Sequence, residues 1–337
     1  MTTIPINRTS ASIYRFNAAE ATRRRPKKEY IFSSCSPESI AMLVGGGGLG
    51  KSYLALQLMV TLALADNSKL AAWALAFNVK KPRSSAFISL EDPADELHFR
   101  LQAIAKHLQL DDAECDTIGS MCSFPTLVGS DFNIADPSWR DDVVSALKAA
   151  HPDGLDLLVI DTLSAAHRAN ETDNTAMGEV MSSIGMIGAA LGCAVLIIHH
   201  VAKDTLKAGT TNTASAARGA SATTNRVRYQ ASVSATDNAD ILSFEVSKVN
   251  GGIKPKPQLW RLVDGAGDRI NLVPQASTLN RKDWKAMETL LANELKAGKA
   301  VNVKIDVGYP SGNTLRPNEF KVTAIIDGKP REWEFDQ

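Results

Sequence analysis

A glycine-rich loop between an apolar segment and a run of helix-forming residues constrains this chain more than any other feature. Residues 45–52 read Gly-Gly-Gly-Gly-Leu-Gly-Lys-Ser and fit the pattern G-x-x-x-x-G-K-[ST]. Residues 40–44 before the loop predict a buried strand, and residues 52–65 after it predict a helix. Glycines let the backbone N–H groups curl round a phosphate at the positive end of that helix. The sequence therefore predicts a nucleoside triphosphate site rather than a chance glycine-rich turn.

The residues of this loop have different expected contacts. Lys51 would reach the β- and γ-phosphates, and the Ser52 hydroxyl would bind Mg²⁺. The residues expected to hold the nucleotide, which we take to be ATP, are Gly45, Gly46, Gly47, Gly48, Leu49, Gly50, Lys51, Ser52 and Tyr53.

Composition narrows the classes of protein that remain. Lysine plus arginine and aspartate plus glutamate each number 37, so only local clusters could attract nucleic acid. The four cysteines lack CxxC spacing, which suits reduced thiols and argues against a structural zinc site. The apolar runs are too short for a membrane span and no signal peptide is evident, so we expect a soluble cytoplasmic protein.

Strand and helix patterns alternate downstream of the loop. Strands are predicted at 85–90, 155–161 and 193–200, and helices at 94–108, 137–150 and 174–191. Residues 111–136 show only short apolar and polar pieces. The alternation predicts an α/β fold in which a parallel sheet is connected by right-handed crossovers.

Polar residues end these strands, at the edge where open α/β sheets bind ligands. Glu91 follows the first strand, although it could equally begin the next helix. Asp161 ends the second strand after four apolar residues, the pattern of a carboxylate that holds the shell of a Mg²⁺ ion. His199 and His200 end the third and should point to opposite faces, so they are not expected to bind one metal together.

Two basic segments allow two interpretations each. Residues 201–224 are rich in Thr, Ala, Ser, Gly and Asn and have little to bury, so they form either a polar linker or a loop that orders on nucleic acid. Residues 1–29 are either a solvated tail or a contact to nucleic acid or a neighbouring subunit. The basic residues within or just after the first segment are Lys203, Lys207, Arg218, Arg226 and Arg228.

The remaining chain predicts β structure and a change of character. An antiparallel hairpin is expected from 227–234 and 241–247, then a turn at 248–252 and a strand at 258–263. Beyond about residue 275 a helix at 281–295 precedes strand-like segments at 301–307 and 319–326. We therefore expect a basic arm over 1–29, a core over 30–274 and a small appended α+β module over 275–337.

The order of these motifs resembles the RecA-type ATPase core, and more narrowly the hexameric replicative helicases encoded by plasmids, the RepA helicase group. The resemblance spans about residues 30–265 and rests on segments 45–52, 90–93, 161–163, 197–200, 217–221, 228–230 and 246–248. It implies a RecA-like P-loop NTPase core with a mainly parallel sheet and antiparallel edge strands, plus a small C-terminal module. Two departures are the Thr- and Ala-rich segment 201–224 and the lack of a clear aromatic residue to stack on adenine.

The resemblance also implies residue roles. Lys51 and Ser52 would hold the phosphates and Mg²⁺, and Asp161 would orient the water ligands of the metal. Glu91 would be the general base that positions the attacking water, and His200 would sense the γ-phosphate. The candidates for a cation inserted by a neighbouring subunit are Arg218, Arg228 and Lys248, and those for DNA contact are Lys203 and Lys207.

Three functions remain open from the sequence. The resemblance implies an ATP-dependent replicative DNA helicase that acts on single-stranded DNA as a homo-oligomeric ring, expected to be a hexamer. Its further partner would be a replication initiator or a primase. The alternatives are a RecA-type DNA-stimulated ATPase of recombination or repair that does not unwind DNA, and a nucleotide-gated regulatory scaffold.

Overall fold

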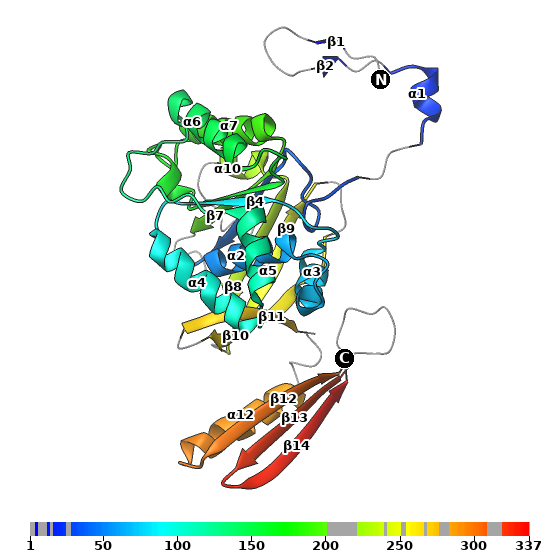
Figure 1. Cartoon of the computed structure of the whole chain (residues 1–337), viewed down its shortest axis with the longest axis vertical. Coiled ribbons are helices and arrows are strands. Elements are labelled where there is room, and N and C mark those ends of the chain that lie inside the picture. Colours follow the sequence, from blue (N-terminus) through cyan, green and yellow to red (C-terminus); the bar gives the residue numbers. More distant parts are fainter. Residues whose placement is uncertain are drawn as a thin grey trace.

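The computed structural model describes residues 4–5, 12–13, 16–24, 28–200, 221–238, 241–250, 254–265, 268–275, 283–308 and 319–336. A nine-stranded sheet with helices packed on both faces forms the main body (Figure 1). The strand order in this sheet is β11-β10-β9-β8-β3-β7-β6-β4-β5. The expected α/β fold, with a mainly parallel sheet and antiparallel edge strands, is confirmed.

The parallel part of the sheet follows the predicted alternation. Its side chains are almost all buried, because helices cover both faces of a parallel sheet. The strands are β3 (Ile40–Gly45), β4 (Ser85–Ser89), β5 (Cys122–Ser123), β6 (Leu157–Asp161), β7 (Ala194–His200) and β8 (Tyr229–Ala235). The helices between them are α2 (Lys51–Ala63), α3 (Ala71–Phe77), α4 (Ala94–His107), α5 (Asp112–Met121), α6 (Pro137–Ala150), α7 (Asn174–Leu191) and α10 (Ser221–Arg226). Two short 3-10 turns are η1 (Ser68–Leu70) and η2 (Ser164–Ala166).

An antiparallel extension continues the sheet beyond β8. It consists of β9 (Ile241–Val249), β10 (Gln258–Gly265) and β11 (Asp268–Gln275). The predicted hairpin of β8 and β9 is confirmed, but the turn expected at 248–252 begins later, because Lys248 pairs with Gln230 and Val249 with Tyr229. Strand β11 was not predicted. It ends at the expected domain boundary of 274/275.

Two hydrophobic cores lie on the two faces of this sheet. Helices α2 to α5 cover one face and α6 and α7 the other. On the first face Trp260 of β10 packs against Trp73 of α3, with ring centroids 5.2 Å apart, and against Phe244 of β9 at 5.5 Å. These contacts tie the antiparallel extension to the helices of the core.

Helix α5 corrects the expectation of an irregular segment over 111–136. It begins with a capping box, in which the Asp111 side chain accepts from the Glu114 N–H and the Glu114 side chain accepts from the Asp111 N–H. Glu114 also pairs with Lys69, at 2.7 Å. The pattern Asp-x-x-Glu was the available signal for this helix.

The C-terminal module has a hydrophobic core of its own. Helix α12 (Asp283–Lys296) packs on an antiparallel sheet of β12 (Val301–Gly308), β13 (Glu319–Ile326) and β14 (Lys329–Asp336) (Figure 1). Its buried side chains include Met287, Leu291, Val322 and Phe335. The predicted helix and strands are confirmed, and β14 is added around Trp333. At the other end of the chain, the arm contains β1 (Ile4–Pro5), β2 (Ser12–Ile13) and α1 (Ala18–Thr22).

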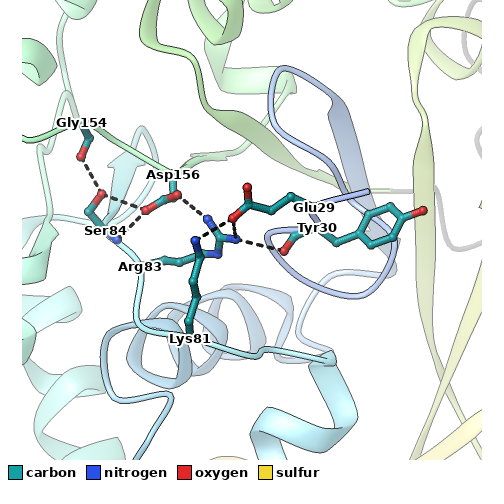
Figure 2. A network of polar contacts seen from close by, with 7 residues as sticks. All are labelled: Glu29, Tyr30, Lys81, Arg83, Ser84, Gly154 and Asp156. Atoms are coloured by element: carbon teal, nitrogen blue, oxygen red, sulfur yellow. Dashed lines mark hydrogen bonds and ion pairs between the residues drawn. The ribbon is translucent and has the colours of Figure 1, made fainter. Parts of the chain in front are cut away.

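A buried arginine fixes the point where the arm joins the core (Figure 2). Arg83, just before β4, bonds Asp156 at 2.6 Å and Glu29 at 2.7 Å, and also donates to the Tyr30 carbonyl at 3.2 Å. Lys81 bonds the same Glu29 oxygen at 2.7 Å. The network joins the segment before β3 to the starts of β4 and β6, at the amino ends of these strands.

Candidate nucleotide site

The predicted site residues converge at the carboxyl edge of the parallel strands. The register places Gly45 of β3 beside His200 of β7, and Asp161 of β6 beside Ser89 of β4. Glu91 follows two residues after Ser89. Four strands separated in sequence therefore bring the glycine-rich loop and the polar strand ends to one place, at the edge where open α/β sheets bind their ligands.

The loop has the backbone shape that phosphate binding needs. Gly48 and Gly50 have φ of 73° and 71°, a region that L side chains rarely adopt. Gly50 is also the N-cap of α2, and no side chain caps this helix end. The first N–H groups of a helix thirteen residues long therefore face the loop, where an anionic phosphate is favoured.

Lys51 lies in this cradle with only 3% of its surface exposed. Its ammonium donates to the Gly46 carbonyl at 2.7 Å and lies 3.0 Å from His200 Nδ1. Because an ammonium can only donate, Nδ1 accepts and the proton of a neutral His200 sits on Nε2. Burial lowers the pKa of Lys51 to about 8, against the opposing charges of Asp161 and Glu91. A bound phosphate would supply the negative charge that this ammonium needs.

Asp161 and Ser52 form the candidate metal position. The Asp161 carboxyl is 2% exposed, and burial raises its pKa to about 6, although it accepts a hydrogen bond from the Ser52 side chain. Its Oδ1 has no hydrogen-bond partner among the described residues. A buried carboxylate oxygen and a hydroxyl beside a phosphate cradle are the oxygen donors that Mg²⁺ prefers, so these residues fit the ion.

Glu91 lies between the two strand ends that flank it in space. Its Oε1 accepts from the Thr162 hydroxyl at 2.7 Å, and its Oε2 lies 3.7 Å from His200 Nε2. The side chain is 46% exposed, so water can reach it. Helix α4 begins only at Ala94, with Pro93 as its N-cap, which leaves the Glu91 side chain out of the helix start.

The two histidines point to opposite faces, as expected from their position on a strand. His200 faces Lys51 and Glu91, while His199 is buried on the other side, where its surroundings include His167 and Glu171. Burial lowers the pKa of His199, and burial and then Lys51 lower that of His200. Both imidazoles are therefore neutral at physiological pH.

Arg100 was missed from the sequence and lies close to this site. It bonds Asp92 at 2.6 Å and Glu96 at 2.9 Å, and its guanidinium stacks over the Tyr53 ring at 5.2 Å. Its charge also contributes to the field at Asp161. The i,i+4 spacing of Glu96 and Arg100 was a signal for their pair, but not for the contact with Tyr53 on another helix.

The candidate cations lie elsewhere. The Arg228 N–H donates to Ile40 O, at the start of β3, and Lys248 pairs beside Gln230 and donates to Thr224 O at 2.7 Å. Both therefore lie at the sheet edge opposite the glycine-rich loop of their own chain. Arg218, Lys203 and Lys207 lie outside the described residues.

Residues 8–205 match a family model described as an AAA domain, over more than half of the chain. The chain belongs to this AAA domain family. The matched range includes the glycine-rich loop, Glu91, Asp161 and His200, so the geometric site and the family assignment coincide. The family and the observed fold identify a RecA-type, ATP-hydrolysing P-loop NTPase.

Solved structures were compared with this fold. The ATPase domain of a helicase superimposes with a TM-score of 0.52 at 10% identity, over 72% of this chain and 87% of that one. The RadB recombinase gives a TM-score of 0.45 at 16% identity, over 70% of this chain and 90% of that one. At such low identity the match to the helicase domain shows the shared fold alone.

Residues 260–328 match a second family model, described as a DNA/RNA non-specific endonuclease. The match begins within β10 of the ATPase sheet and ends in the turn after β13, so it crosses the expected boundary at 274/275. This stretch contains no histidine. Among the described residues, no cluster of three or more His, Cys, Asp or Glu side chains could hold a metal ion. No described helix has the length and apolarity needed to cross a membrane.

Proposed function

We propose that the protein is an ATP-driven DNA helicase that works as a homo-oligomeric ring on single-stranded DNA. The observation that carries this proposal is the division of the expected catalytic groups. Lys51, Asp161, Glu91 and His200 meet in one site, whereas Arg228 and Lys248 lie at the opposite sheet edge. A cation on that edge cannot serve its own site, but it could serve the site of an adjacent subunit.

The site supports hydrolysis of the γ-phosphate by water. Lys51 would bind the phosphate oxygens, and the Ser52 hydroxyl with Asp161 would hold Mg²⁺, which offsets the negative charge of the phosphates when bound. Glu91 would accept the proton of the attacking water, since its Oε2 is the oxygen that faces the Lys51–His200 side. A cation from a neighbour would stabilise the charge that develops on the phosphoryl group, an effect worth about 10³–10⁵ in rate in known NTPases.

Coupling to DNA would run through His200. This residue ends β7, contacts Lys51, and is followed directly by residue 201, the start of the Thr- and Ala-rich segment. A change at the γ-phosphate that moves His200 would therefore reach this segment without an intermediate element. Lys203 and Lys207 would contact the DNA backbone, which carries no sequence information.

The test compares ATPase rates with and without single-stranded DNA, alongside displacement of a strand from a forked duplex. A helicase should show both stimulation and ATP-dependent displacement. Stimulation without displacement would support the DNA-stimulated ATPase instead. No stimulation would support the regulatory scaffold.

A double variant tests the DNA segment itself. Lys203→Ala with Lys207→Ala should weaken single-stranded DNA binding, reduce its salt slope by about 0.7 for each phosphate that is no longer neutralised, and remove stimulation while basal hydrolysis survives. Lys106→Ala with Lys148→Ala removes two exposed lysines near the ends of α4 and α6 and is the charge-matched control. Equal DNA affinity and stimulation in both variants would show that 201–224 is a linker.

A further inference from the structure

Thr162 stands directly after the candidate metal carboxylate and is fully buried. Its hydroxyl donates to Glu91 Oε1 at 2.7 Å and lies 3.0 Å from Ser164 Oγ. Since the single hydroxyl proton of Thr162 goes to Glu91, the Ser164 hydroxyl donates in the second bond. A chain of two hydrogen bonds therefore ends on the carboxylate of Glu91.

The sheet holds both ends of this contact at the same level. Leu90 N donates to Asp161 O, and Leu163 N donates to Ile198 O, each at 2.8 Å. Thr162 is thus fixed between two backbone bonds to neighbouring strands, and Glu91 follows directly after a residue fixed to the same strand end. The Thr162 hydroxyl cannot drift from Glu91 unless these strand ends separate.

We propose that Thr162 is a positioning residue for Glu91. This inference rests on the proposed role of Glu91 as the base. The terminal torsion of a glutamate is broad, so an unheld carboxylate samples many orientations. With Oε1 held by Thr162, Oε2 is turned toward His200 Nε2, 3.7 Å away, on the side where Lys51 would bind the γ-phosphate. The oxygen that receives the proton of the water is thereby set in advance.

The test uses two substitutions that differ in the hydroxyl. Thr162→Val keeps the shape of the buried side chain and removes the donor, while Thr162→Ser keeps the donor. We expect kcat for ATP to fall about 10–100-fold in Thr162→Val, with KM and ADP affinity within about twofold of wild type. Thr162→Ser should stay within about threefold of the wild-type kcat. A purely structural role would lower nucleotide affinity as well and would not distinguish valine from serine in this way.

A double-variant comparison separates this inference from the function on which it rests. If Thr162 acts only through Glu91, adding Thr162→Val to Glu91→Gln should leave the residual rate of Glu91→Gln unchanged. Near wild-type hydrolysis by Glu91→Gln would refute the role of Glu91 itself. A slow Glu91→Gln variant beside a fully active Thr162→Val variant would overturn the positioning role alone.

A third variant guards against loss of folding in Thr162→Val. Ser164 is exposed, so Ser164→Ala should fold normally. It removes the donor that orients the Thr162 hydroxyl, and we expect kcat to fall about two- to fivefold at unchanged KM, with no effect in the Glu91→Gln background. An unchanged kcat in Ser164→Ala, or a loss that persists in the Glu91→Gln background, would contradict the proposal.

Discussion

Replacing Lys51 with methionine should stabilise the nucleotide-free protein while abolishing hydrolysis. Burial lowers the pKa of this ammonium from 10.5 to about 8, and one pKa unit corresponds to about 1.4 kcal/mol. Its charge therefore destabilises the folded state by at most about 3 kcal/mol at neutral pH. Methionine has a similar length but loses the bond to Gly46 O, which costs about 1 kcal/mol. We expect the free energy of unfolding to rise by about 2 kcal/mol.

The pH dependence of this gain identifies its cause. Between pH 8 and 10.5 the folded wild-type protein loses the Lys51 proton, while the unfolded chain keeps it. The free energy of unfolding of the wild type therefore rises with pH in this window, and the advantage of Lys51→Met shrinks. Urea denaturation without nucleotide at pH 7 and pH 10 measures both differences. A variant less stable than wild type at pH 7, or an advantage equal at both pH values, would refute the reasoning.

Two further predictions concern the metal carboxylate and the subunit contact. Burial raises the pKa of Asp161 to about 6, so Mg²⁺-dependent ATP binding should weaken as pH falls below 6. For the same reason the free energy of unfolding without nucleotide should decrease as pH rises from about 4 to 6, where only the folded state keeps this proton; Asp161→Asn should remove both effects, and their persistence in that variant would count against this assignment. Arg228→Ala or Lys248→Ala subunits mixed with wild type should inhibit the mixture more than their share predicts. A strictly proportional loss of ATPase rate would exclude both as trans-acting cations.

The nucleotide loop could be predicted because its constraints are local. The positive φ of Gly48 and Gly50, the buried strand before them and the helix after them all leave marks in adjacent residues. The alternation of strands and helices then determined that Asp161 and His200 would reach the same edge. Their side chains could be assigned to that edge before any distance was known.

The contacts that complete the site could not be predicted in this way. Thr162 meets Glu91 only because β6 lies beside β4, and Arg100 stacks on Tyr53 only because α4 packs near α2. Neither neighbour relation is encoded by spacing along the chain. Lys248 was assigned to a turn because the following Asn-Gly-Gly is a strong local signal. Pairing of β9 with β8 overrode that signal for two more residues.

The Arg83 network defines where the folding unit begins. Sequence patterns alone would start the ATPase core at the first strand of its sheet, β3 at Ile40. Arg83 is 6% exposed, however, and half of its ion pairing comes from Glu29, eleven residues earlier. A chain shortened to Ile40 would leave this guanidinium with Asp156 as its one carboxylate partner among the residues described, and would also remove the Tyr30 carbonyl. The smallest self-sufficient form of this ATPase therefore begins before Glu29, with a segment that belongs to no element of the sheet.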